Sequence, residues 1–300
     1  MACHYRGVRP LSLPRDTVAR ALLTRIAGPD ADAARNRIHR TPGQRLFDPD
    51  SPIGRVHGDA SMFVGGVRAL LMQSLHPQVM AAVADHSDYR SDPWGRLQNT
   101  ATFIATTTFG TSEAATQAIA IVRAVHTRVV GTTPEGLPYG ASDPHLLAWV
   151  HLAGAESFLL AHQHFGRHPL GRTDCDEYVA QAAVVARALG AEDVPTTVVE
   201  LRAQLAGFRR ELASTEAARD VARFLLLPPP VPWAARPGYT LIASAGFALL
   251  PPWARQALGV PSVPALDPVL RAGGRAMTAT IRWALDPLDP LRAPVRAAPA

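Results

Sequence analysis

The sequence predicts an all-α protein: a single globular helical domain of about eight to ten helices. Apolar residues recur at intervals of three and four, and capping residues or prolines mark the starts of several segments. We find no strand-length alternation of apolar and polar residues. At 300 residues, of which 47% are hydrophobic, the chain can bury a core large enough to enclose a bulky ligand.

The first two helices are predicted from apolar spacing. Residues 16–40 carry apolar side chains at helical intervals, and a turn region containing Pro and Gly follows through Gly54. The next apolar pattern predicts one long buried helix over 60–85. We expect this helix to bend near His76, because Pro77 removes a backbone donor.

The middle helices are predicted from their ends. Ser91 or Asp92 can cap a helix that has Pro93 at its first position, which predicts a helix over 93–109. The capping rule starts another helix at Ser112 and Gly131 stops it, and Pro144 opens one over 144–166. Further helical segments are expected over 175–189, 198–206, 215–227, 239–250 and 267–285, before a Pro- and Ala-rich tail.

Composition excludes several classes of protein. No stretch approaches the roughly 20 apolar residues of a membrane span, and no secretory signal is recognisable, so we expect a cytoplasmic protein. The net charge is +5, and all 30 basic residues are arginines scattered among acids, which does not favour nucleic-acid binding. Cys3 and Cys175 have no ligand or redox spacing. Motifs for nucleotide binding, serine hydrolysis, zinc proteolysis and di-iron sites are missing.

Three histidines lie inside apolar helical segments: His76, His126 and His151. One such histidine is usually a hydrogen-bonded core residue. Three in separate helices favour a ligand role, because neutral imidazole binds transition metals and haem iron. The HQH sequence at 162–164 is expected on the surface, since residues two apart on a helix do not face each other.

A second candidate cluster lies on the helix expected over 93–109. Arg96 and Thr100 are four residues apart and share a face, with Asn99 beside them. An inward arginine requires an anionic partner, because an unpaired buried charge is costly. Two sources fit the spacing equally: a cofactor carboxylate, or a nearby acid such as Asp85, Asp88 or Asp92.

These residues carry a family resemblance. Gly58–Asp59, His76–Pro77, Asp85–His86, Asp92–Pro93 with Arg96 and Thr100, His126, and Trp149–Val150–His151 occur in this order. The stretch from Gly58 to Gly166, trailing weakly to about Leu250, resembles the MpaB and rubber oxygenase catalytic-domain family. Members such as the latex-clearing proteins are all-helical, bind haem b and cleave the double bonds of polyisoprenes with O2. MpaB itself is linked to oxidative cleavage of a terpenoid side chain.

The resemblance implies a haem b enzyme that uses O2 and holds the cofactor in a buried pocket of the helical domain. His126 matches the proximal iron ligand, with His151 and His76 as the runners-up, while Arg96 and Thr100 match polar residues on the distal side. Latex-clearing proteins carry lysine just before that threonine, where this chain has Asn99, an amide that donates a hydrogen bond without positive charge.

The substrate that fits this departure is a small apolar alkene, terpenoid or lipid-like molecule, in a channel formed around Phe63, Phe103 and Phe109. We expect an N-terminal helical extension over 1–57, an oxygenase-like domain over 58–250, and a C-terminal helical segment with a flexible tail over 251–300. Two other interpretations stay open: a non-catalytic helical protein that binds an apolar ligand, and an oxidase with a histidine-bound nonhaem metal. The sequence leaves the oligomeric state undetermined.

Overall fold

Helices make up most of the described part of the chain. The structure is a computed structural model that describes residues 30–87, 91–227 and 233–286, with Arg15, Ala19, Leu23, Thr24, Gly28 and Val231 besides. Most of the helix expected before Asp30, and the tail expected after Asp286, lie outside the described residues. Where the structure is described, it confirms the predicted all-α class.

Thirteen α-helices are present among the described residues, more than the eight to ten expected. They are α2 (Ala31–Arg40), α3 (Pro52–His57), α4 (Met62–Gln73), α5 (Pro77–His86), α6 (Pro93–Phe109), α7 (Ser112–His126), α8 (Pro144–Phe165), α9 (Arg172–Leu189), α10 (Val198–Gly207), α11 (Glu216–Leu226), α12 (Arg236–Ala248), α13 (Pro252–Ala257) and α14 (Asp267–Leu285). The short helices α3 and α13 have too few turns to show a period in the sequence.

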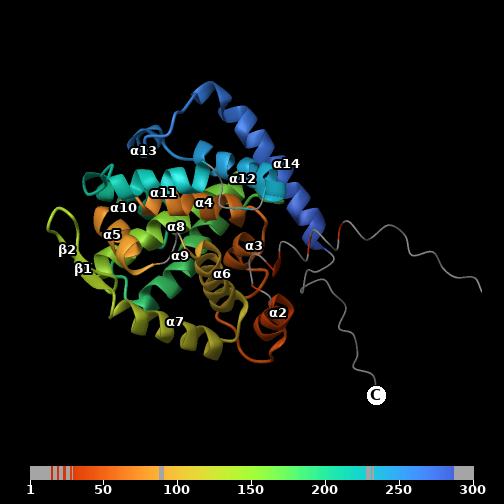
Figure 1. The fold of residues 1–300 in the computed structure, drawn as a ribbon. Helices are drawn as coiled ribbons and strands as arrows, with labels where there is room; N and C mark the ends of the chain where they lie inside the picture. Colours follow the sequence, from red (N-terminus) through yellow and green to blue (C-terminus); the bar gives the residue numbers. More distant parts are fainter. Residues whose placement is uncertain are drawn as a thin grey trace, which may run out of the picture.

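Helix α8 forms the centre of the bundle, with α4 on one side and α9 on the other (Figure 1). Trp149 and Leu152 of α8 are fully buried. Helix α4 approaches α8 closely at Gly65, where an added Cβ would lie 2.8 Å from Cδ1 of Phe158. Helix α12 packs on α4 and against α14, which completes the bundle along its upper edge.

The helix expected over 60–85 is two helices. Helix α4 ends at Gln73, and His76 has the extended conformation that precedes α5, whose first residue is Pro77. A residue before proline is pushed out of the helical region, so the expected bend is a complete break. His76 therefore lies at a junction between helices, where its ring is available to other segments.

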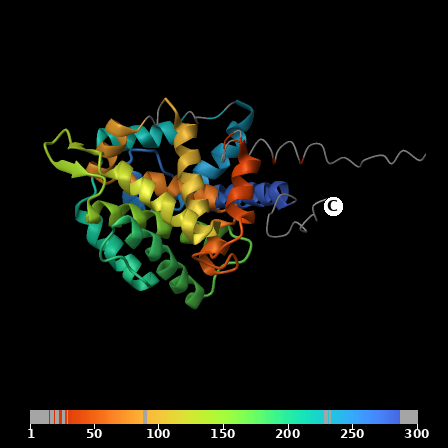
Figure 2. The same cartoon turned by 90° about the horizontal axis from the view of Figure 1, so that it is seen from below.

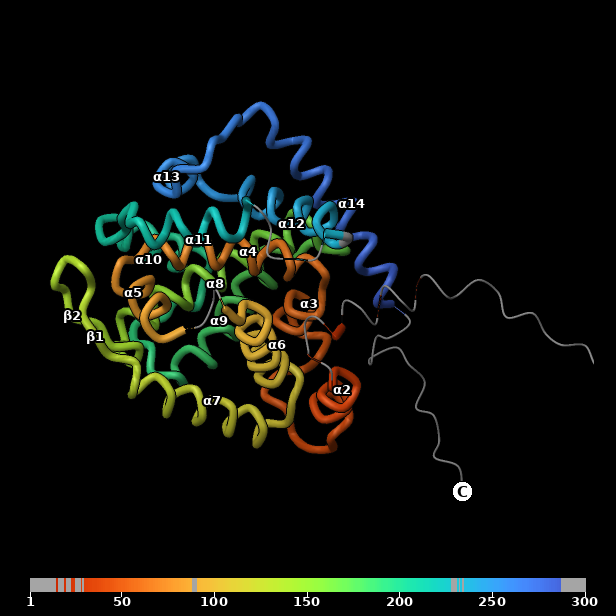
Figure 3. The backbone as a smooth tube through the Cα atoms, in the orientation of Figure 1, coloured from red at the N-terminus to blue at the C-terminus, as the bar shows by residue number. Residues whose placement is uncertain are grey.

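The sequence shows no sign of strands, but the described residues include two. Strands β1 (Val130–Thr132) and β2 (Pro138–Gly140) form an antiparallel hairpin with Gly131 opposite Tyr139. Three-residue strands are too short to show alternation. The hairpin begins at Val130, four residues after α7 ends at His126, so that helix does not continue to Gly131 (Figure 3).

Helices α6 and α7 form an antiparallel pair on the outside of the bundle, shown from below in Figure 2. The predicted bounds of α6 are confirmed, and Asp92 caps it by accepting a hydrogen bond from the Gly95 amide at 2.9 Å. Only the last three residues of α6 are buried, and in α7 only Ala115 and Ile119. The pair is thus anchored to the core where α6 ends and α7 begins, and its other end is open.

No helix in the described residues has both the length and the apolar character that a membrane crossing requires.

Candidate functional site

The three candidate residues of α6 lie on its exposed half. The Arg96 guanidinium donates a hydrogen bond to the Ser87 hydroxyl, which follows α5. Asn99 and Thr100 are exposed, and the Thr100 hydroxyl donates to the Arg96 carbonyl oxygen at 3.0 Å. The N-terminal half of α6 therefore presents a cation, an amide and a hydroxyl within two turns.

Two of the three nearby acids considered as partners of Arg96 have other contacts in the structure. Asp85 accepts a hydrogen bond of 2.6 Å from the Tyr139 hydroxyl. Asp92 caps α6, and Asp88 lies outside the described residues.

His126 is half-buried at the end of α7. Burial lowers the pKa of its imidazole below the ordinary 6.5, so the ring is neutral near pH 7. Its Nδ1 is enclosed and has no hydrogen-bond partner among the described residues. A neutral ring with an unpartnered nitrogen is the form of histidine that binds a metal.

His151 on α8 is similarly enclosed. Burial, with a smaller effect of the Arg187 charge, lowers its pKa to about 4, and no described group hydrogen-bonds its buried Nε2. Arg123, one turn before His126, donates to the Ala188 carbonyl at 3.2 Å. His151 therefore lies near the last turn of α9, which contains Arg187, and Arg123 of α7 contacts the same turn at Ala188.

The open end of the α6–α7 pair brings His126 and Arg96 to the same end of the molecule. His86 at the end of α5 lies 3.1 Å from the Val130 carbonyl, just beyond α7, and Arg96 contacts the adjacent Ser87. Large apolar side chains are exposed at this end, with Leu97 of α6 at 40% and Val125 of α7 at 44%. The partly buried imidazole of His126 therefore lies at the same end of the molecule as a cationic side chain and exposed apolar side chains.

The three phenylalanines expected around a channel are spread along the bundle. Phe63 packs against the main core, and Phe103 is half-buried in α6. Phe109 is buried at the far end of α6 from Arg96, with its ring 5.2 Å from that of His39.

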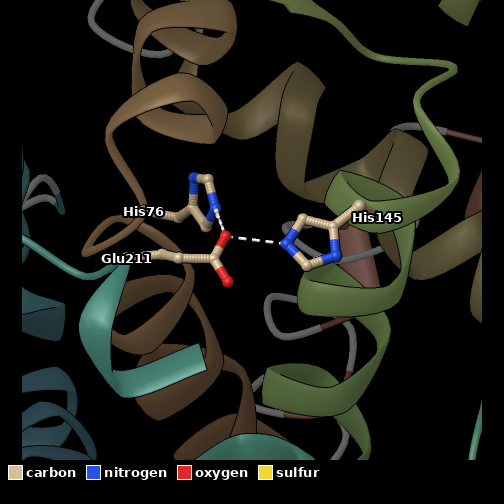
Figure 4. Close-up of side chains that lie close together, drawn as sticks. All are labelled: His76, His145 and Glu211. Atoms are coloured by element: carbon tan, nitrogen blue, oxygen red, sulfur yellow. Dashed lines mark hydrogen bonds and ion pairs between the residues drawn. The ribbon is translucent and has the colours of Figure 1, made fainter. Parts of the chain in front are cut away.

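His76, the third candidate ligand, has partners that the sequence did not indicate. Its ring is 1% exposed, and burial lowers its pKa against the smaller opposing effect of Glu211. Nε2 of His76 lies 3.5 Å from Oε2 of Glu211, and Nε2 of His145 lies 2.7 Å from the same oxygen (Figure 4). No spacing rule connects His145 to a residue so distant in the sequence, so only the fold reveals this cluster.

The surface position expected for the HQH sequence is wrong for His162. This ring is 3% exposed, and its Nδ1 has no hydrogen-bond partner in the described part of the chain. Helix α8 is covered on most sides, so Ala161, His162 and Phe165 near its end are all buried. His164 is half-buried.

Comparison with known proteins identifies the family. The model of the ER-bound oxygenase mpaB/B'/Rubber oxygenase catalytic domain matches residues 54–283, well beyond the stretch that carries the sequence resemblance. No curated protein and no solved structure matches the chain. The match confirms the resemblance and supports an oxidoreductase of the oxygenase class. With most of its length covered, this chain belongs to the mpaB and rubber oxygenase catalytic-domain family.

Proposed function

We propose that this protein is a haem b-dependent oxygenase that oxidises or cleaves a C=C bond of a small apolar substrate with O2. Family membership supplies the oxygenase class. The observation that carries the cofactor assignment is the neutral, desolvated His126, which lies at the same open end of the α6–α7 pair as Arg96.

His126 would hold the iron. Its lowered pKa keeps a nitrogen lone pair free near pH 7, so little proton competition opposes ligation. His151 also has a lowered pKa and an unpartnered buried nitrogen, which makes it the first alternative ligand. When bound, haem b supplies the O2 chemistry, and the protein supplies binding, orientation and electrostatics.

The α6 residues would contribute charge and hydrogen bonds. Arg96 is suited to a cofactor carboxylate, because its guanidinium forms paired hydrogen bonds with such groups. Asn99 would donate a hydrogen bond near the reacting atoms and the Thr100 hydroxyl oxygen would accept one, and neither adds charge. Since Asn99 is no amine, this chain does not place a second cation there, and its chemistry would differ from that of relatives with lysine.

The apolar side chains at this end favour an apolar substrate. Leu97 and Val125 are each more than a third exposed although they lie on helices that pack together. Burying such side chains against a ligand stabilises a complex by roughly 25 cal/mol for each Å² removed from water. A terpenoid or lipid-like alkene fits this surface better than a charged molecule does.

The visible spectrum of the purified protein tests the cofactor. We expect a Soret band and one haem per chain after reconstitution with hemin. His126→Ala should remove most of the band, whereas His168→Ala, which removes an exposed histidine, should keep it. Full haem retention by His126→Ala would refute the ligand assignment. In that case His151→Ala and His76→Ala would test the other two candidates.

The reaction is tested with 18O2 and a terpenoid alkene. Cleavage by a dioxygenase breaks the C=C bond and gives two carbonyl groups with one 18O each, whereas a monooxygenase product carries a single label. A colourless protein with bound metal would favour the nonhaem oxidase instead. A protein with neither haem nor metal would favour a binding protein for apolar ligands.

A further inference from the structure

The cluster of His76, His145 and Glu211 does not include His126, the proposed haem ligand, and it has the composition of a metal site. Among the described residues, these three form a group whose candidate ligand atoms all lie within 4.8 Å of one another. Both imidazoles point toward Oε2 of Glu211 (Figure 4). Two imidazoles and one carboxylate suit a divalent transition metal such as Zn²⁺.

His76 is the member whose surroundings indicate a missing ligand. Its ring is 1% exposed, and neither Nδ1 nor Nε2 has a hydrogen-bond partner in the described part of the chain. Burying an unpaired polar atom is costly. Nε2 lies 3.5 Å from Oε2 of Glu211. Two donor atoms that each lie about 2.1 Å from one tetrahedral Zn²⁺ are about 3.4 Å apart, which matches this separation.

His145 completes the donor set from the solvent side. Its Nε2 lies 2.7 Å from Oε2 of Glu211, the length of a hydrogen bond, and a shared metal ion would widen this gap by less than 1 Å. The side chain is 56% exposed, so it has room for that shift. Its ring stacks on Phe208 with centroids 4.5 Å apart, which holds the imidazole in orientation.

The three ligands come from separate segments. His76 immediately precedes α5, His145 is in the first turn of α8, and Glu211 follows the 3-10 turn at Phe208–Arg210. A metal ion would join these segments, and the exposed side of Glu211 would leave a position for water. We infer that His76, His145 and Glu211 form a Zn²⁺ site that cross-links the α4–α5 junction, α8 and the end of α10.

Zinc titration of the full chain tests this inference. After treatment with EDTA, isothermal titration with ZnCl2 should give one site per chain. His145→Ala and Glu211→Gln should each weaken that site at least tenfold, and both change exposed side chains, so the fold should persist. His168→Ala removes an exposed histidine elsewhere and should bind zinc as the wild type does.

The haem ligand variant separates this site from the proposed active site. His126→Ala should lose haem and keep its zinc affinity, whereas His145→Ala should keep the Soret band and lose zinc affinity. Zinc should also raise the melting temperature of the wild type and not that of Glu211→Gln. Absence of zinc binding, or equal zinc affinity in the wild type and His145→Ala, would overturn the inference.

Discussion

Arg255 and Asp267 form a two-pronged ion pair between α13 and the start of α14. Two guanidinium nitrogens of Arg255 donate to the two carboxylate oxygens at 2.9 and 2.8 Å. The side chains are 8% and 12% exposed. The substitution Asp267→Asn keeps the shape of the side chain and leaves a buried guanidinium without its counter-charge.

The loss of stability should be about 3 kcal/mol. Breaking a buried pair from one side costs about 3–5 kcal/mol. The lower end applies because Arg255 would keep its hydrogen bonds to the carbonyl oxygens of Leu250 at 2.9 Å and Ala248 at 2.7 Å. Urea unfolding followed by circular dichroism measures this, with the slope m unchanged. The matched control is Asp32→Asn, at a side chain that is 91% exposed, and it should be neutral.

The pH dependence gives a second readout of the same pair. The hydrogen bond from Arg255 lowers the pKa of Asp267 below the ordinary 3.8, although burial opposes the shift. A carboxyl with a lowered folded pKa stabilises the protein above its unfolded pKa and loses that contribution as pH falls through the folded value. The difference between wild type and Asp267→Asn should therefore shrink below about pH 4. A difference under 1 kcal/mol at pH 7 would refute this reasoning.

Two further predictions concern the packing of α4 and the buried His57. Gly65→Ala should destabilise the protein in urea unfolding, because the new methyl group would lie 2.8 Å from Phe158. At the adjacent Gly66 an added Cβ would meet no atom within 4 Å, so Gly66→Ala should be neutral or stabilise the protein by up to about 1 kcal/mol. Equal effects of the two substitutions would contradict the close approach of α4 and α8. Burial lowers the pKa of His57 to about 3, so below pH 6.5 the unfolded chain takes up a proton that the folded ring resists. Between pH 7 and 5 the wild type should lose about 2 kcal/mol more than His57→Gln, and equal losses would disprove the assignment.

Much of the candidate haem site could be anticipated from short stretches of sequence. The cap at Asp92 with Pro93 predicted where α6 begins, and this set Arg96 and Thr100 on one helix. Capping residues and prolines act on the backbone groups beside them, so their effect can be predicted from the local sequence alone. The ordered motifs from Gly58 to His151 also identified the family, which the matched region confirms.

Contacts between distant segments could not be predicted in this way. The α6–α7 turn brings Arg96 and His126 to one end of the molecule, and helix packing determines that Asn99 is exposed and His162 buried. The helix break before Pro77 positions His76, and the start of α8 positions His145, so that both side chains lie close to Glu211.

By itself, the sequence determined the helical class, most helix starts and the family. Only the tertiary structure decided which side chains lie close together and which histidine nitrogens are buried away from solvent. The physical reason is the range of the interactions: capping depends on neighbours within one turn, whereas burial depends on every helix that packs around a residue. The separation of a proposed haem site from a proposed zinc site is therefore a property of packing.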